Sequence, residues 1–300
     1  MEQLLQQLIN GVAWGSIYAL IALGYTMVYG VLKLINFAHG EVYMVGAMSG
    51  YYAAHALGLA ERPSFVGLAA VLLVSMASCA LLGALIERVA YRPLRSAGRL
   101  APLITAIGVS LLLQHLGQLV FGADPKFFPT LLEPREVLRK GALAISNIQL
   151  AVLIIALILM AGLQFIVMRT RFGRAMRAVA YDAPAAALMG VPVDRVIQGT
   201  FVLGSMLAAA AGVLVGLSNP KIDPLMGLLP GLKAFVAAVL GGIGSIPGAM
   251  LGGLLLGVIE TLVAGYLSST YRDAIAFVVL IVILLYRPAG LLGRAQTEKV

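Results

Sequence analysis

The stretch PSFVGLAAVLLVSMASCALLGALI, residues 63–86, contains no Asp, Glu, Lys or Arg. A helix rises about 1.5 Å per residue, so a stretch of this length crosses the roughly 30 Å hydrocarbon core of a bilayer. Inside that core every backbone N–H and C=O must be hydrogen-bonded within the protein, and a helix achieves this within one segment. The stretch therefore predicts a membrane-spanning helix.

Further uncharged stretches lie on both sides, at residues 3–32, 42–60, 100–123, 141–168, 196–220 and 234–259, followed by 261–271 and 274–286. Hydrophobic residues make up 61% of the 300 residues and charged residues 11%, against about 45–50% and 25% in soluble domains. A water-soluble globule cannot bury this much apolar surface. We expect an all-α fold, a polytopic integral membrane helical bundle that forms a single domain over residues 1–300.

The positive charges gather in two gaps between the apolar stretches, and the net charge is +8. The gaps at residues 87–99 and 169–195 contain Arg88, Arg92, Arg95, Arg99, Arg169, Arg171, Arg174, Arg177 and Arg195. Cytoplasmic loops carry an excess of Lys and Arg, so both gaps are predicted to be cytoplasmic rather than a face for nucleic acid. Counting three crossings back from residue 87 places the N-terminus outside. The mixed loop 124–146 also faces outward.

The charges near residue 300 decide whether the number of crossings after residue 195 is even or odd. The tail of the chain contains the basic residues Arg287, Arg294 and Lys299, which predict a cytoplasmic C-terminus. One crossing is residues 196–219, and three more fit residues 225–242, 248–266 and 272–287. The first of these three is short and contains Lys233, so we expect a re-entrant or broken helix there. The total is about eight to nine crossings.

Glycine is used in two ways. Pairs such as Gly11/Gly15 and Gly253/Gly257 fit the G-x-x-x-G spacing, which lets helix backbones approach closely in lipid. The segment GGIGSIPG, residues 241–248, is different because four glycines and a proline break a helix. Gly241, Gly242, Gly244 and Ser245 then belong either to a hinge or wall of a transport pathway or to a plain cytoplasmic turn.

Polar residues interrupt the apolar pattern at two further places. The segment INFAHGE, residues 35–41, contains Asn36, His39 and Glu41 between two long apolar runs. It is either a loop at the surface or an unwound stretch that lines a cavity, since polar groups at bilayer depth normally face the bundle interior. Glu260 is an isolated acid in an apolar stretch. It is either a pathway residue or structural partner inside the bundle, or a residue near a helix end.

Enzyme motifs are absent from the sequence. The pattern H-x-E at residues 39–41 lacks the C-x-x-C of a zinc deaminase, because Cys79 is the single cysteine. The Walker A pattern G-x-x-x-x-G-K-[ST] does not occur. We therefore predict no catalytic residue, metal site or bound cofactor in this chain, and a membrane enzyme is disfavoured.

The loop at residues 169–195 contains a predicted short helix. Asp182 is suited to cap it, Pro184 is tolerated in the first turn, and residues 185–189 favour helix. Gly190 suits the left-handed position after the last turn. A helix over residues 183–189 is marginal alone in water. It either packs against a partner or remains a solvated loop.

Several stretches together resemble a known family. They are NGVAWG at 10–15, YTMVYG at 25–30, residues 35–46, IERVAYRP at 86–93, residues 173–196, residues 232–257 and RPAGLLG at 287–293. The chain resembles the membrane permease subunit of bacterial high-affinity branched-chain amino acid ABC transporters. The resemblance extends over the whole chain except residues 124–146.

The resemblance implies a multi-pass protein of the bacterial inner membrane that works in a complex. The partners are a second homologous permease subunit, two cytoplasmic ATP-binding subunits that hold the ATP, and an extracytoplasmic protein that delivers leucine, isoleucine or valine. A permease for another small polar solute, such as urea, an amide or another amino acid, is the alternative. An ion-coupled secondary transporter would fit the composition equally well.

The resemblance also assigns roles to residues. The ATPase-coupling loop at residues 169–195 comprises Gly173, Arg174, Arg177, Asp182, Pro184, Ala185, Leu188, Met189 and Gly190. Segments 36–41 and 241–248 match breaks near the bundle centre. The predicted translocation pathway accordingly comprises Asn36, His39, Glu41, Gly241, Gly242, Gly244 and Ser245, with Glu260 added from the local sequence.

Overall fold

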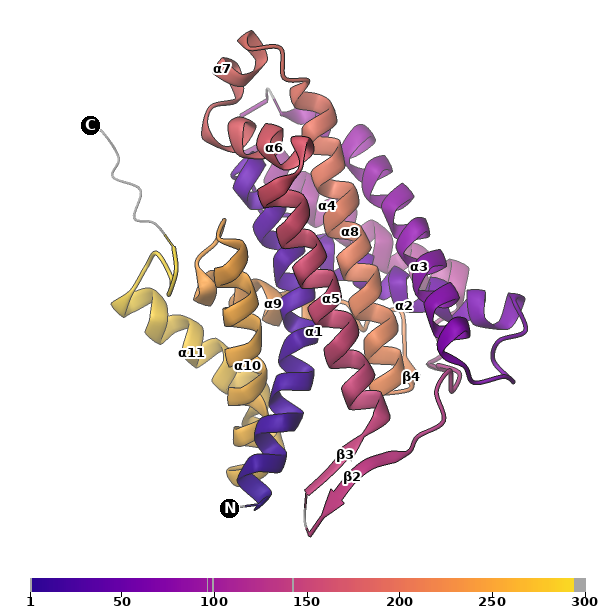
Figure 1. The fold of residues 1–300 in the computed structure, drawn as a ribbon. Helices are drawn as coiled ribbons and strands as arrows, with labels where there is room; N and C mark the ends of the chain where they lie inside the picture. Colours follow the sequence, from indigo (N-terminus) through magenta and orange to yellow (C-terminus); the bar gives the residue numbers. More distant parts are fainter. Residues whose placement is uncertain (1, 96, 99, 142, 294–300) are drawn as a thin grey trace.

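The computed structural model describes residues 2–95, 97–98, 100–141 and 143–293, and the described part is a helical bundle (Figure 1). Its first half contains α1 (Glu2–Leu32), α2 (His39–Ala56), α3 (Phe65–Ile86), a π-helical turn η1 (Glu87–Tyr91), η2 (Arg92–Leu94) and α4 (Leu100–Phe121). The second half contains α5 (Asn147–Arg169), α6 (Arg171–Tyr181), α7 (Ala183–Leu188), α8 (Val193–Ser218), α9 (Leu228–Gly241), α10 (Ile246–Tyr266), η3 (Ser269–Tyr271) and α11 (Arg272–Tyr286). The predicted all-α membrane bundle is confirmed.

Four short strands accompany the helices, and the hydropathy pattern did not predict these strands. β1 (Lys126–Phe127) pairs antiparallel with β4 (Lys221–Ile222), and β2 (Glu136–Lys140) forms a hairpin with β3 (Leu143–Ser146). Both pairs lie at the end of the bundle that holds the N-terminus (Figure 1). The backbone N–H of Ala144 donates to the Gln6 side chain at 2.8 Å, which ties the hairpin to α1.

Seven helical segments of the described chain are long and apolar enough to cross a membrane. They are Glu2–Leu32, Phe65–Leu94, Leu100–Phe121, Asn147–Arg169, Val193–Ser218, Ile246–Tyr266 and Ser269–Tyr286. The 14 residues of α9 give about 21 Å of helix, less than the roughly 30 Å hydrocarbon core. The predicted short segment at residues 225–242 therefore corresponds to α9. The predicted total of eight or nine depends on how α2 and α9 are counted.

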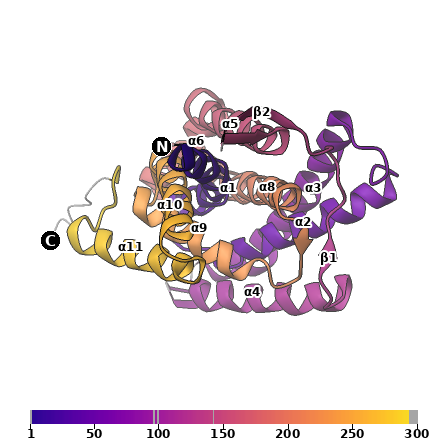
Figure 2. The ribbon, with the colours of Figure 1, turned by 90° about the horizontal axis from the view of Figure 1, so that it is seen from below.

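Glycines make the closest helix contact within the bundle. α1 crosses α10 where Gly15 meets the backbone of Gly253 and Leu254, and a side chain at Gly257 would overlap Gly15. The predicted glycine pairs on α1 and on α10 thus pack against each other, and backbone contact replaces side-chain contact. In contrast, α4 and α11 are peripheral (Figure 2), and Ala276 is the one buried residue of α11.

The two basic gaps meet at the opposite end from the N-terminus. Arg95, from the first gap, donates to the Asp194 carboxylate in the second at 2.8 Å. The loop around α7 projects at this end, and the N-terminus lies at the other (Figure 1). This agrees with the prediction that the two gaps share one side. Arg99, Arg294 and Lys299, on which part of that prediction relied, lie outside the described residues.

Candidate translocation pathway and coupling loop

The segment between α1 and α2 lies inside the bundle. Asn36, His39 and Glu41 are all buried, so the surface-loop interpretation is wrong. Asn36 accepts a hydrogen bond from the Tyr91 hydroxyl at 2.8 Å. The non-helical part ends in a turn at residues 37–38, because His39 and Glu41 already belong to the first turn of α2.

Polar atoms of this segment are left without hydrogen-bond partners in the described protein. His39 Nε2 is one, and its ring contacts the Tyr25 ring edge-on at 4.8 Å between centroids. Glu41 Oε2 is another, whereas Glu41 Oε1 accepts from the Gln114 amide at 2.8 Å. Buried polar groups are nearly always paired. Unpaired atoms at this depth are therefore the kind of feature that a solute pathway would leave.

Glycine backbones surround the same segment. Gly40 of α2 packs against Gly227 and Gly231 at the start of α9, where a side chain on either partner would overlap backbone. A side chain at Gly24 of α1 would overlap the His39 ring. The contact between α1, α2 and α9 therefore combines close glycine backbone packing with the rings of Tyr25, His39 and Phe235.

The segment 241–248 is a helix break, as predicted. α9 ends at Gly241 and α10 begins at Ile246, and Gly242 between them has φ 105°, which favours glycine. Ser245 caps α10 by accepting from the Gly248 N–H at 3.2 Å. The chain segment after α11 folds back here, because the N–H groups of Leu291 and Leu292 donate to the carbonyls of Leu240 and Gly241, each at 2.9 Å.

The break also forms the wall of a pocket of roughly 580 Å³. Gly244 and Ser245 line it together with Thr26 of α1 and Arg177 of α6. The pocket therefore lies toward the end of the bundle that holds the basic gaps, rather than at the bundle centre. A hinge or pathway wall and a turn at the bundle end both remain consistent with this position.

Glu260 lies in a buried ion cluster rather than beside the first two segments. Its carboxylate accepts from the Tyr18 hydroxyl and from Arg272 Nε, both at 2.9 Å, and pairs with Lys233 Nζ at 2.9 Å. Lys233 also pairs with Asp273 at 2.5 Å. The cluster joins α1, α9, α10 and α11. The predicted pathway residues therefore occupy three separate places, and Glu260 has the contacts of a structural partner.

The predicted helix of the basic loop is present as α7. The Asp182 carboxylate accepts from the Ala185 N–H at 2.8 Å, and Pro184 lies in the first turn. The helix ends at Leu188, one residue before the predicted end, and Gly190 follows with φ 81°.

The helix α6 was not predicted, and it explains two loop residues. Gly173 packs so closely on the backbone of Val167 that a side chain would overlap it, and Arg177 donates to the Val167 carbonyl. Both residues therefore hold α6 against the end of α5. Its buried residues Gly173, Met176 and Val179 recur every three positions, and this spacing is the signal that could have revealed α6.

The tip of the loop exposes apolar side chains. Tyr181 is 95% exposed, Leu188 90% and Met189 85%. α7, which ends at Leu188, projects beyond the ends of α5 and α8 (Figure 1). Exposed apolar groups gathered in one place mark a surface that another protein covers.

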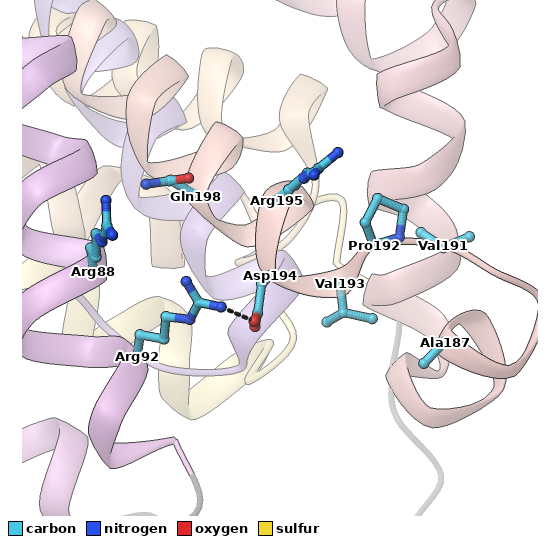
Figure 3. Close-up of a pocket in the computed structure, with 9 residues that line it drawn as sticks. All are labelled: Arg88, Arg92, Ala187, Val191, Pro192, Val193, Asp194, Arg195 and Gln198. Atoms are coloured by element: carbon cyan, nitrogen blue, oxygen red, sulfur yellow. Dashed lines mark hydrogen bonds and ion pairs between the residues drawn. The ribbon is translucent and has the colours of Figure 1, made fainter.

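A basic pocket adjoins this tip. It measures roughly 790 Å³ and lies between η1 and the connection from α7 to α8 (Figure 3). Arg88, Arg92 and Arg195 line it, and Arg92 forms an ion pair with Asp194 at its edge. A partner docked on α7 would therefore also meet this positive surface.

Comparison with known proteins gives consistent matches over the whole chain. The profile of the family described as branched-chain amino acid transport system / permease component matches residues 7–284. A high-affinity branched-chain amino acid transport system permease protein of Pseudomonas aeruginosa is 48% identical over 300 residues, covering 99% of this chain and 98% of the relative. The protein of that description from Escherichia coli K12 is 46% identical, with 99% and 97% covered. A probable branched-chain amino acid transport permease protein of Methanocaldococcus jannaschii is 29% identical, with 95% and 91% covered.

Proposed function

The chain belongs to the family of permease components of branched-chain amino acid transport systems, and we propose that it carries leucine, isoleucine and valine through the membrane as one subunit of an ATP-driven importer. The observation that carries this proposal is the full-length likeness to permease proteins of that description, at 46–48% identity. ATP is bound and hydrolysed by partner subunits. This chain supplies the membrane passage and no cofactor of its own.

The ATP-binding subunits dock on the tip formed by Tyr181, Leu188 and Met189. The exposed apolar tip supports this assignment, because contact with another protein would remove these side chains from water. α7 also projects beyond the spanning helices. The adjoining arginine-lined pocket extends the same surface. In this proposal α6 transmits the motion of the partner, since Gly173 and Arg177 fasten α6 to α5.

The docking assignment also sets the orientation in the cell's inner membrane. ATP-binding subunits are cytoplasmic, so the end with the basic gaps faces the cytoplasm and the N-terminus faces outward. The arginine excess in those gaps supports the same orientation. The extracytoplasmic amino-acid-binding protein then docks at the end with β1–β4. A second homologous permease subunit packs beside this one, and the peripheral helices α4 and α11 are the surfaces that it or lipid covers.

Transport in this proposal alternates between two states of the paired permeases. Closure of the ATP-binding subunits pulls on α7 and shifts the bundle, and the states need only differ in their contacts with solute. The glycine contacts around residue 40 and the break at 241–248 are the places where helices can slide or bend. The unpaired polar atoms of His39 and Glu41 then become accessible to water or solute.

The test is ATP-dependent uptake in vesicles that contain the assembled transporter and its binding protein. Replacing Leu188 and Met189 by Asp should abolish copurification of the ATP-binding subunits and reduce uptake to background. Leu138→Asp is the control for copurification alone, because Leu138 is an exposed leucine of the β2–β3 hairpin, at the end away from the ATP-binding subunits. Uptake that persists without ATP would point to an ion-coupled transporter. Uptake of urea or amides in place of leucine would favour the other solute class.

A further inference from the structure

A third pocket lies within the end of the bundle that holds the N-terminus. It measures roughly 240 Å³ and is bounded by α1, the last turn of α8 and the connection from α8 to α9. This is slightly below the roughly 300–1,000 Å³ of typical ligand pockets, as suits a small solute.

Two opposite charges line this pocket from one short segment. Lys221 and Asp223 both line it, and they lie on either side of Ile222 in the extended chain at β4. Side chains alternate between the two faces of an extended segment. Ile222 is fully buried on one face, so Lys221 and Asp223 point to the other. β4 is held in place by its pairing with β1.

Both charges remain available to a ligand. Neither Lys221 nor Asp223 belongs to an ion pair with another described residue. The Asp223 carboxylate accepts one local hydrogen bond, from the Leu225 N–H at 2.9 Å. The pocket is therefore lined by one cationic and one anionic side chain from the same short segment, which suits a zwitterionic ligand.

The remaining lining is largely apolar or aromatic, with the Asn219 amide and two tyrosines, Tyr18 and Tyr43, as its other polar residues. Ile17 and Val215 are buried side chains that line the pocket, and Met226 closes it from the start of the α9 region. Small-molecule sites combine an apolar lining with a few polar groups that fix orientation. The apolar wall suits an aliphatic side chain.

We infer that this pocket binds a zwitterionic α-amino acid with a short aliphatic side chain on its way into the bundle. The α-carboxylate faces Lys221, the α-ammonium group faces Asp223, and the side chain lies against Ile17, Val215 and Met226. The inference rests on the proposed function, since it names where this chain receives the solute. Because the solute must leave again, the site is of low affinity.

The experiment measures protection of an introduced thiol in the assembled transporter. Met226→Cys, and separately Asn219→Cys, which also lines the pocket, is labelled from outside with a membrane-impermeant maleimide. The unsubstituted transporter gives the background, because Cys79 is buried. Leucine should slow the labelling several-fold. Isocaproate, which lacks the ammonium group, and isoamylamine, which lacks the carboxylate, should protect much less.

Charge variants sharpen the assignment. Asp223→Asn should raise the half-protecting leucine concentration about tenfold, equivalent to about 1.4 kcal/mol, and should improve protection by isocaproate relative to leucine. Lys221→Gln should favour isoamylamine in the same way. Asp124→Asn and Lys126→Gln are matched controls, because both residues lie at the same end outside the pocket lining.

Two outcomes overturn the inference. One is equal labelling of both thiols with and without leucine, at concentrations where the unsubstituted transporter imports leucine. The other is protection that Asp223→Asn and Lys221→Gln leave unchanged. Failure of the proposed function is seen separately, as an unsubstituted transporter that does not import leucine with ATP.

Discussion

Two ion clusters of four residues hold the molecule together at different depths. The buried cluster joins Lys233, Glu260, Arg272 and Asp273, whereas the basic-end cluster joins Glu87, Arg92, Arg95 and Asp194. Each connects helices far apart in sequence. Each cluster has buried and half-exposed members: the Glu260 side chain is 0% exposed and that of Asp273 50%, while the Glu87 side chain is 1% exposed and that of Asp194 51%.

The difference in exposure decides what each cluster can tolerate. Charges removed from water need complete pairing, so losing one member leaves the others buried and uncompensated. At an exposed pair, water and salt replace the lost partner. Glu260, with two cationic partners, therefore fixes the positions of α9, α10 and α11. In the basic-end cluster only the half-exposed pairs of Asp194 can open and close at little cost, because Glu87 is buried.

The largest expected effect comes from Glu260→Gln. It leaves Lys233 and Arg272 without their shared carboxylate, and we expect a loss of about 3–5 kcal/mol in the free energy of unfolding. Thermal unfolding in detergent, followed by loss of the monodisperse peak, measures this. The double variant Lys233→Met with Glu260→Met should recover much of the loss. Glu133→Gln is the control, because Glu133 belongs to an exposed pair with Arg135.

Glu87→Gln tests whether depth matters within the basic-end cluster. The Glu87 side chain is buried although its partner Arg95 is partly exposed. We expect a loss of about 1–3 kcal/mol, since a hydrogen bond to a charged group is weakened but water still reaches Arg95. A loss as large as that of Glu260→Gln in the same assay would contradict the comparison.

Tyr18→Phe removes one neutral donor from the buried cluster. The Tyr18 hydroxyl donates to Glu260, which keeps both of its cationic partners in this variant. A loss of about 1 kcal/mol is expected, the usual net value of one hydrogen bond. Unfolding in a denaturant series measures it. A loss above that of Glu87→Gln would show that the hydroxyl, not the cations, controls the cluster.

Asp194→Asn should have the smallest effect. It breaks pairs with Arg92 and Arg95 at a half-exposed site, and exposed pairs contribute about 0.2–1 kcal/mol. The difference from the unsubstituted protein should shrink further at high salt. Unfolding measured at two ionic strengths checks this. A large, salt-independent loss would mean that Asp194 is buried in the assembled transporter.

The bounds of the spanning helices could be predicted from the sequence, whereas the partners within the ion clusters could not. Spanning helices are a local property of about 20 residues, so residues 248–266 and 272–287 were predicted close to the bounds of α10 and α11. The partners of Glu260 were not predicted, because pairing depends on how each helix is rotated toward its neighbours. The sequence analysis identified Lys233 only as a charge within a short apolar segment. It did not predict that Lys233 is the ion partner of Glu260.

The candidate site divides in the same way. The cap at Asp182 and the break at residues 241–248 were predicted, because caps and glycine turns depend on neighbouring residues. The burial of Asn36, His39 and Glu41 was left open between two interpretations, because local sequence does not fix the depth of a connecting segment. β1 and β4 contribute two residues each and lie far apart in the sequence. No local sequence pattern predicts that they pair.

The packing of α1 on α10 has a consequence for the timing of synthesis. α1 is complete once residue 32 has been made, but the glycine surface that fits Gly15 belongs to residues 253–257. At about 5–20 residues per second, α1 waits on the order of 10–50 seconds for that partner. During this interval its small-residue face has lipid, the insertion machinery or other helices of the chain as neighbours. The first helix of the protein is therefore among the last to reach its final contacts.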